Sequence, residues 1–360
     1  MGGAGVNCVW KIGALAATLA LGGCGWPGLV AGALTTPTSG DDASTNVAIA
    51  GGMAYVARSA RGIERIDLAS GKRSVIAPPA PADRIDDVAV ADGLLFALDA
   101  TPPGNLVVFK LEGNGDLRQV ALAPAPVGPF SGVAAGGGHV IVSGGTSELT
   151  LRTYAVDGAL SQPVADDFGR GQPDVVLTDG GRVTLISTHL SGPRFGLTVA
   201  DITDAPLQLH ERGYVELPGA GFTDGGFHPA NFPLQVAALG DVALVAHGGG
   251  LSVVATPAGK PPMLLGTIAL ALHATAIAVD AERHLAFVVG ASPRPELLTL
   301  DVADPRAPRI VERLALPSTG SPTAIALDAT HLVVALQGGG VHHQARTAPL
   351  IPPPTPETVP

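Results

Sequence analysis

Cysteine is nearly absent from this sequence. The chain has two cysteines, Cys8 and Cys24, and both lie close to its N-terminus. Because no thiol follows Cys24, the long remainder of the chain has neither a disulfide framework nor a metal site with cysteine ligands.

Aromatic and basic residues are also scarce. Phe, Trp and Tyr make up 4% of the chain, and both tryptophans, Trp10 and Trp26, lie near the N-terminus. There are 21 Lys and Arg residues against 31 Asp and Glu, a net charge of −10. Lys11 is the only charged residue before Cys24, so the chain from Cys24 onward carries −11. Nucleic-acid binding needs a basic surface that neutralises phosphates, so this composition argues against a nucleic-acid partner and favours an acidic protein of the cell envelope.

The features that are present begin with a leader. Residues 1–23 contain Lys11 and the apolar run Ile12–Leu21, which is too short to span a bilayer and is typical of a signal peptide. Leu21-Gly22-Gly23-Cys24 resembles a bacterial lipobox. The resemblance implies that Cys24 becomes the lipidated first residue of the mature protein, and Gly25 after it implies the outer membrane. The alternatives are an ordinary secretory signal that is cut nearby and an anchor that stays in the membrane.

Composition divides the rest of the chain into three parts. Residues 24–44 are rich in Gly, Thr, Ser and Pro and are predicted to form a tether. Residues 45–347 alternate short apolar runs with turn residues and form the folded body. Residues 348–360 are rich in proline, so we expect an extended, disordered tail.

The folded body repeats one pattern seven times. Each unit opens with two short apolar strands around a tight turn, as in Asn46–Ala50, Gly51-Gly52 and Met53–Ala57, which is a hairpin pattern. The seven openings start at residues 47, 88, 133, 175, 236, 276 and 324. Units of this size with four strands each are typical of propeller blades. The sequence therefore predicts an all-β fold, a seven-bladed β-propeller of four-stranded antiparallel blades.

The last unit contains only three predicted strands before the proline-rich tail. A ring must close to remove its open strand edges, so we expect the segment Leu29–Leu34 to supply the missing outer strand. The alternatives are an unclosed ring and a strand donated by residues 347–351.

Two segments carry a family resemblance. Leu197–Asp204 and Leu298–Asp304 each read as a strand followed by an Asp-containing turn, and they resemble the LVIVD repeat of bacterial envelope proteins. The resemblance implies a propeller in the cell envelope and implies no reaction. Within these segments Asp201, Asp204, Asp301 and Asp304 are predicted to cap the turn between the third and fourth strands.

Long connections are predicted to gather at one end of the ring. We call this end the loop rim; it holds the connections from second to third strand, such as Ser187–Gly196, and the connections from each blade to the next. Loops on a rigid scaffold often carry function. The longest insert, residues 218–232, is the candidate binding loop, with Phe222, Asp224, Phe227, His228 and Phe232 as its candidate contact residues. The alternative is that its phenylalanines plug the channel mouth.

Metal and catalytic signals are weak. His189, His228, His247 and His273 all map to the loop rim, but none of them has the close spacing typical of metal ligands, so we predict no metal and no cofactor. His342 and His343 are adjacent strand residues that point to opposite faces. The pairs Asp86-Asp87 and Asp166-Asp167 lack a calcium-loop pattern and are interpreted as solvated turn residues.

These observations favour a monomeric, lipid-anchored propeller that binds an envelope protein or a small ligand at the loop rim and has no catalytic activity. The alternative is a propeller hydrolase, similar to a lactonase, with its site at the channel mouth. A third possibility is a bare structural spacer.

Overall fold

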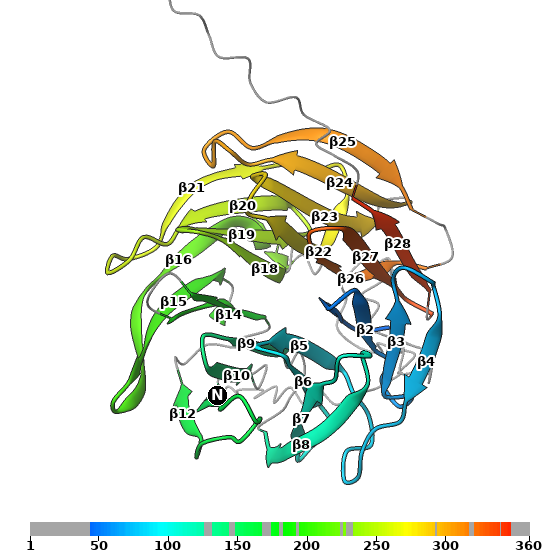
Figure 1. Cartoon of the computed structure of the whole chain (residues 1–360). Helices are drawn as coiled ribbons and strands as arrows, with labels where there is room; N and C mark the ends of the chain where they lie inside the picture. The colour runs from blue at the N-terminus through cyan, green and yellow to red at the C-terminus, as the bar shows by residue number, and fades with distance from the viewer. Residues whose placement is uncertain are drawn as a thin grey trace, which may run out of the picture.

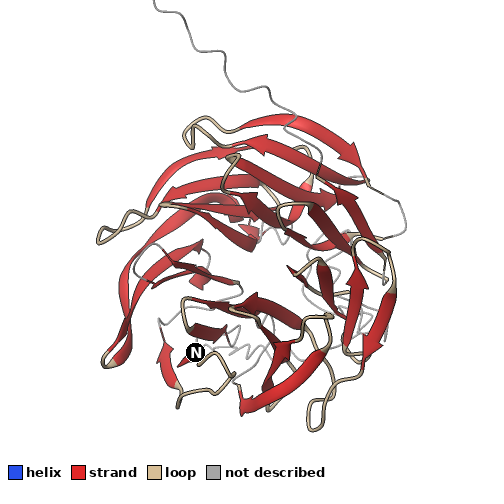
Figure 2. Cartoon of the chain, viewed as in Figure 1, coloured by secondary structure: helices blue, strands red, loops and turns tan. Residues whose placement is uncertain are grey.

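The computed structural model describes residues 44–125, 132–143, 148–167, 174–179, 183–191, 194–223, 226–227, 233–291, 294–316, 320–338 and 340–346. Throughout these ranges the regular elements are strands, β1 to β28 (Figure 2). No helix among them is long and apolar enough to cross a membrane.

The strands form seven antiparallel sheets, which we number in chain order. The first sheet contains β1 (Val47–Ala50), β2 (Met53–Ala57), β3 (Ile63–Asp67) and β4 (Arg73–Ile76). The second contains β5 (Asp87–Ala91), β6 (Leu94–Asp99), β7 (Asn105–Leu111) and β8 (Leu117–Pro124). The third contains β9 (Gly132–Gly136), β10 (His139–Ser143), β11 (Glu148–Thr153) and β12 (Val164–Asp167).

The fourth sheet contains β13 (Val175–Asp179), β14 (Val183–Ser191), β15 (Arg194–Asp204), β16 (Leu207–Thr223) and β17 (Gly226–Phe227). The fifth contains β18 (Pro233–Leu239), β19 (Val242–His247), β20 (Gly250–Ala255) and β21 (Met263–Ile268). The sixth contains β22 (His273–Asp280), β23 (Leu285–Ala291), β24 (Pro295–Asp301) and β25 (Arg309–Ala315). The seventh contains β26 (Pro322–Leu327), β27 (His331–Leu336) and β28 (Val341–Ala345).

The sheets stand around a ring, each with its first strand innermost (Figure 1). The inner strands contact one another in the cyclic order β1, β5, β9, β13, β18, β22 and β26. β26 then contacts β1, so the last sheet packs on the first. The predicted propeller arrangement is confirmed, and each of the seven predicted openings lies in one of these inner strands.

The inner strands are built for a crowded centre. Val47–Ala50 alternates a branched residue with alanine, and small side chains let neighbouring strands approach closely around the ring. The turn that follows has Gly51 and Gly52 at φ of 57° and 76°. These are left-handed backbone angles, which a two-residue hairpin requires at both positions and glycine adopts without strain.

Seven apolar clusters fill the joints between neighbouring sheets. The joint between the seventh and first sheets buries Val47, Val56, Ile66, Ala324 and Val333. Burying a side chain of this size contributes about 1.5–3 kcal/mol. Because each sheet is covered on both faces, its inner strands are apolar on both faces, as the sequence indicates.

The predicted number of complete blades is wrong. Six sheets have four or more strands, but the seventh has three among the residues that the structure describes. The expected closing strand, Leu29–Leu34, and the alternative donor, residues 347–351, lie outside the described residues, as do the leader, most of the tether and the tail.

The fourth sheet also departs from the prediction. Residues 187–196 were expected to form a loop, but β14 and β15 continue through most of this range as a paired hairpin. β16 likewise continues to Thr223, where residues 218–232 were expected to be a loop. A bulge lies where the register of β15 on β16 shifts between Arg194 and Gly196. Pro218 is tolerated there because a bulged residue need not donate to the ladder.

Candidate functional site

A belt of polar residues lies at the loop rim, at the start of the inner strands. We call it the inner-strand belt; it comprises Asn46, Asp87, Asp174, Gln235 and Thr275. Each of these residues lies at or near the start of its inner strand, and each bonds to the next sheet. The belt thus links five of the seven pairs of neighbouring sheets at the loop rim.

Asp87 is the most fully engaged member of the belt. One carboxylate oxygen accepts hydrogen bonds from the Asn46 side chain and from the Val88 amide, the latter at 2.8 Å. The other accepts from the Val133 amide at 2.7 Å. Burial nevertheless raises the pKa of Asp87 to about 6, since an ionised carboxylate loses hydration there. The interpretation of Asp87 as a solvated turn residue is therefore wrong: Asp87 is 9% exposed.

Asp174 repeats this arrangement two sheets further on. Its Oδ2 accepts a hydrogen bond from the Val236 amide at 2.6 Å. Burial raises the pKa of Asp174 to about 8, and the negative charge of Asp87 adds to the rise. The belt then continues without charge. Gln235 Oε1 accepts from the Ile277 amide at 2.8 Å, and Thr275 Oγ1 donates to the Pro322 carbonyl at 2.9 Å.

This belt was not predicted from the sequence. A polar residue directly before a strand resembles an ordinary turn residue, and the amide that it binds lies in the next sheet, as with Asp87 and Val133. A polar residue before six of the seven openings was the one signal available, and Gly132 before Val133 is the exception.

A second feature of the loop rim is the raised end of the fourth sheet. The inner strand begins at Val175, which pairs with Ser187, whereas β14 continues to Ser191. β15 has 11 residues and β16 has 17. Phe222 pairs with Phe227 in the small hairpin of β16 and β17. Two of the five candidate contact residues thus lie in paired strands, while Asp224, His228 and Phe232 lie outside the described residues.

Three of the four candidate histidine ligands lie in strands, and His228 lies outside the described residues. His189 pairs with Gly196 in the hairpin of β14 and β15, and His273 begins β22. His247 ends β19 in place of the expected loop and is fully buried, with Nε2 2.9 Å from Ser252 Oγ. Burial lowers the pKa of His247 to about 4, so it is neutral at pH 7. The described part of the chain holds no group of three side chains that suits a metal.

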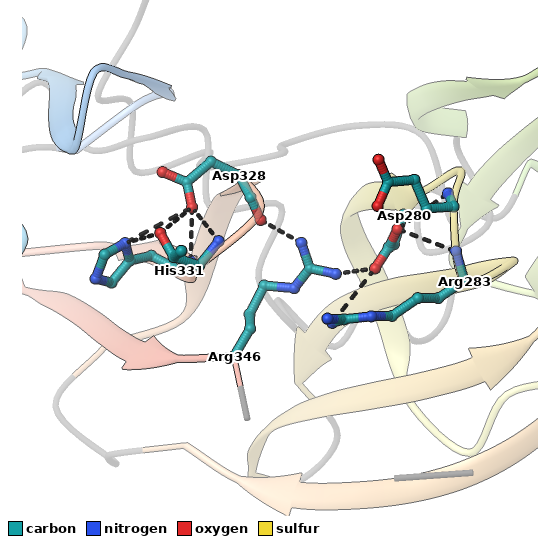
Figure 3. Close-up of polar contacts among 7 residues, drawn as sticks. Asp280, Arg283, Asp328, His331 and Arg346 are labelled. Carbon is teal, nitrogen blue, oxygen red and sulfur yellow. Dashed lines mark hydrogen bonds and ion pairs between the residues drawn. The ribbon is translucent and has the colours of Figure 1, made fainter. Parts of the chain in front are cut away.

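The opposite end of the ring, which we call the turn rim, carries the turns between first and second and between third and fourth strands. A pocket of about 250 Å³ opens there between the sixth and seventh sheets. Figure 3 shows Arg346 reaching from the end of β28 to the Asp280 carboxylate and the Asp328 carbonyl. The side chains of Arg346 and Asp280 are each 7% exposed. Arg283 lies 3.7 Å from the same carboxylate oxygen of Asp280.

The contacts at this pocket hold the two sheets together. Asp328 accepts from the backbone amides of Thr330 and His331, each at 2.7 Å, and so fixes its own turn. The Arg346 guanidinium also lies over the Phe287 ring, 5.8 Å from its centroid. Buried ion pairs of this kind are costly to break from one side, so the pocket is primarily a structural joint.

The predicted turn caps on this rim are confirmed for Asp301 and Asp304. Asp301 accepts from the Ala303 amide and Asp304 from the Arg306 amide, each at 3.0 Å. The Ala303 bond is the main reason that the pKa of Asp301 lies below its ordinary value. Asp204 differs, because its carboxylate lies 2.7 Å from His139 Nε2 of the neighbouring sheet.

The two remaining pairs of adjacent residues, His342-His343 and Asp166-Asp167, both lie in strands. His342 and His343 occupy adjacent positions of β28 opposite Val334 and Val333, as expected for ordinary strand residues. Asp166 and Asp167 end β12, where they pair with Leu149 and Glu148.

Comparisons with known proteins support the fold alone. No known protein family matches the sequence, and no curated protein matches it. A crystal structure of a proposed 6-phosphogluconolactonase from Bacteroides uniformis is similar, with a TM-score of 0.62, 14% identity, and coverage of 80% of this chain and 88% of that chain. One from Bacteroides fragilis has a TM-score of 0.60, 14% identity, and coverage of 85% and 90%. A protein from Lactobacillus plantarum has a TM-score of 0.61, 17% identity, and coverage of 85% and 91%. At these identities the resemblance to the LVIVD repeat stays a prediction.

Proposed function

We propose that this protein is a lipid-anchored binding propeller of the bacterial cell envelope, and that its partner contacts the raised end of the fourth sheet. The lipobox-like Leu21-Gly22-Gly23-Cys24 supports the anchor, with the outer membrane as the location. The propeller arrangement supports a rigid scaffold that presents one rim to a partner, which is a protein or a small ligand.

The single observation that carries this proposal is the length of the fourth sheet. Its β14 passes the start of its own inner strand by the four residues Thr188–Ser191, and β16 is longer than any other outer strand described here. The extension of β14 pairs with Arg194–Leu197 of β15, where Phe195 and Leu197 belong to the apolar joint with the fifth sheet. The part that ring packing does not require is the end of β16 beyond the buried Leu217, together with its hairpin with β17. A projecting, paired strand end that includes Phe222 and Phe227 is suited to contact, since aromatic residues are enriched in binding surfaces.

Binding by the intact lipoprotein is tested with a paired variant. Phe222→Ser with Phe227→Ser removes the aromatic pair from the hairpin and should abolish retention of the partner from solubilised envelopes. Val156→Ser is the matched control, because Val156 is an apolar residue, 81% exposed, in the connection between β11 and β12. Equal partner lists for all three proteins would exclude the raised end as the contact site.

Lipidation is tested separately. Cys24→Ser should move the protein from the membrane fraction to the soluble fraction and should abolish incorporation of a labelled fatty acid. Retention of the label by this variant would contradict the anchor.

A hydrolase that acts at the channel mouth is the second candidate. The observation that favours it is that Asp87, which is buried, and Asp174, which is half-buried, both have raised pKa values. Carboxyl groups with pKa values shifted toward neutral pH are common at active sites. Two of the structural neighbours are also named as proposed 6-phosphogluconolactonases. Hydrolysis of a sugar lactone by the purified protein, lost in Asp174→Asn, would favour this candidate over the first.

A further inference from the structure

The third strand of the seventh sheet is packed unlike its counterparts. In the fifth sheet the third strand, β20, is buried from Gly250 to Val254 beneath a fourth strand. β28 holds the same place in the seventh sheet, but none of its residues is buried. His342 Nε2 of β28 is a buried atom with no hydrogen-bond partner among the described residues. The outer edge of β28 therefore has the properties expected of an edge that pairs with a further strand.

The C-terminal segment is poorly suited to be that neighbour. It would have to turn directly after Arg346 and run back along β28. Pro349 and Pro352–Pro354 fall in the required stretch. Proline has no amide hydrogen to donate to the ladder and is confined to edges and bulges. A regular strand from this segment would lose its hydrogen bonds where β28 offers carbonyl acceptors.

The N-terminal segment reaches the ring at the correct place. Ser44 is fully buried, and its Oγ accepts a hydrogen bond from Arg58 Nη1 at 2.7 Å. The Thr45 amide donates to the Ala57 carbonyl at 3.1 Å. These contacts hold the chain at the loop rim of the first sheet, which packs against the seventh. In the other sheets, the chain passes along this rim from the outer strand of one sheet to the inner strand of the next. A chain that came to Ser44 from the outer edge of the seventh sheet would follow the same route.

The spacing agrees with that route. Between Ile76 of β4 and Asp87 of β5 there are ten residues, and between Ile268 of β21 and His273 of β22 there are four. A strand that includes Leu29–Leu34 and ends at Thr36 leaves ten residues before Val47. Leu-Val-Ala-Gly-Ala-Leu contains no proline and no charge, so every amide can join the ladder and both faces can be covered.

We propose that Leu29–Leu34 is the fourth strand of the seventh sheet and pairs antiparallel with β28. Antiparallel pairing sets the direction: Leu29 lies at the turn rim beside Arg346, and Leu34 lies toward the loop rim. Four residues lie between Cys24 and Leu29, so the two are at most about 18 Å apart. The turn rim therefore faces the membrane, and the raised end of the fourth sheet faces away from it. The proposed pairing of this strand with β28 does not depend on lipidation, whereas the orientation toward the membrane rests on the proposed lipidation of Cys24.

Cysteine crosslinking tests the strand directly. The soluble chain that begins at residue 24 with Cys24→Ser has no thiol, so two cysteines can be introduced without competition. With His343→Cys fixed, single cysteines at residues 29–34 should crosslink at every second position, because strand side chains alternate between faces. A cysteine at the exposed Val311 of β25, paired with the same set, is the control and should not crosslink. Crosslinking through Leu350→Cys alone, or no crosslink at all, would overturn the proposal.

Thermal unfolding gives an independent measurement. Starting the chain at residue 41 in place of 25 should lower Tm by about 5 °C or more, and a peptide of residues 27–38 should restore it. Removing residues 348–360 should leave Tm unchanged. If the two truncations have the same effect, the N-terminal segment is not the closing strand.

The orientation is tested on the lipidated protein in vesicles that carry a quencher in the headgroup region. A fluorophore at Arg306→Cys, an exposed site of the turn rim, should be quenched several-fold more than one at Ala60→Cys on the loop rim. The reverse order overturns the orientation. If the protein does not bind vesicles while the crosslinks form, the lipid anchor fails and the closing strand stands.

Discussion

The fourth and seventh sheets share an interior and differ at their outer parts. Both contribute an inner strand to the ring, and both bury their middle strands: Leu197 in the fourth sheet and Leu332 in the seventh are fully buried. The fourth sheet then continues into β16, with 17 residues, and a fifth strand. The seventh ends, among the described residues, at the five-residue β28.

This difference separates what the ring requires from what it permits. The inner strands and the apolar joints must fit two neighbours, so they vary little from sheet to sheet. The outer strands contact fewer elements and are free to lengthen or to come from elsewhere in the chain. We therefore infer that the variable outer parts carry the contacts of the protein: a partner at the fourth sheet, and the N-terminal segment at the seventh.

The largest expected effect tests whether the two interiors are equivalent. Leu197→Ala and Leu332→Ala each remove a fully buried side chain from a joint between sheets. Each should lower the free energy of unfolding by about 3 kcal/mol, from lost burial and the cavity left behind. Urea titration of both variants measures this. Val311→Ala, at a 38% exposed site of β25, is the control. A cost below about 1 kcal/mol for Leu332→Ala alone would mean that the seventh sheet is not packed as a member of the ring.

A smaller loss of stability is expected when the buried arginines of the two sheets are replaced. Arg346 links the seventh sheet to Asp280 of the sixth, and Arg212 links the fourth sheet to the Pro257 carbonyl of the fifth at 2.6 Å. Arg346→Met should cost about 2 kcal/mol, because it leaves a buried carboxylate whose remaining cation, Arg283, is 3.7 Å away.

The matching experiment is a double-mutant cycle. Adding Asp280→Asn to Arg346→Met should recover part of the loss, since the unpaired charge is then absent. Arg212→Met serves as the counterpart in the fourth sheet and should lower stability by a similar amount. Strictly additive effects of Arg346→Met and Asp280→Asn would argue that this ion pair does not hold the joint.

The sequence predicted the inner part of the ring because its signals are local. Val47–Ala57, with Gly51-Gly52 at its turn, specifies a hairpin within eleven residues, and the same kind of pattern placed all seven openings. The raised end of the fourth sheet was missed because Pro218 and Gly219 read as the start of a loop. In the structure a bulge accommodates the proline, and pairing with β15 continues. The belt was missed because its bonds join residues more than forty positions apart, as with Asp87 and Val133.

The smallest expected effect concerns the belt and depends on pH. Asp174 of the fourth sheet has a pKa raised to about 8. Thr323, the second residue of β26 in the seventh sheet, is uncharged and donates to the Ala335 carbonyl. In the unfolded chain Asp174 loses its proton near pH 4. Between pH 4 and 8 the folded state binds more protons, so stability falls as pH rises through this window.

Asp174→Asn should remove that fall while its side-chain oxygen still accepts from the Val236 amide. At pH 5 the variant and the original protein should have similar Tm values, because the folded carboxyl is protonated. Because Asp174 is only half-buried, solvent reduces the cost of its charge, so at pH 8.5 the variant should be more stable by about 3 °C. Thr323→Val should give the same change at both pH values, since no ionisable group is altered. If Asp174→Asn lowers Tm equally at both, the carboxylate is ionised in the folded protein, and the belt joins its sheets through a charged bond at this position.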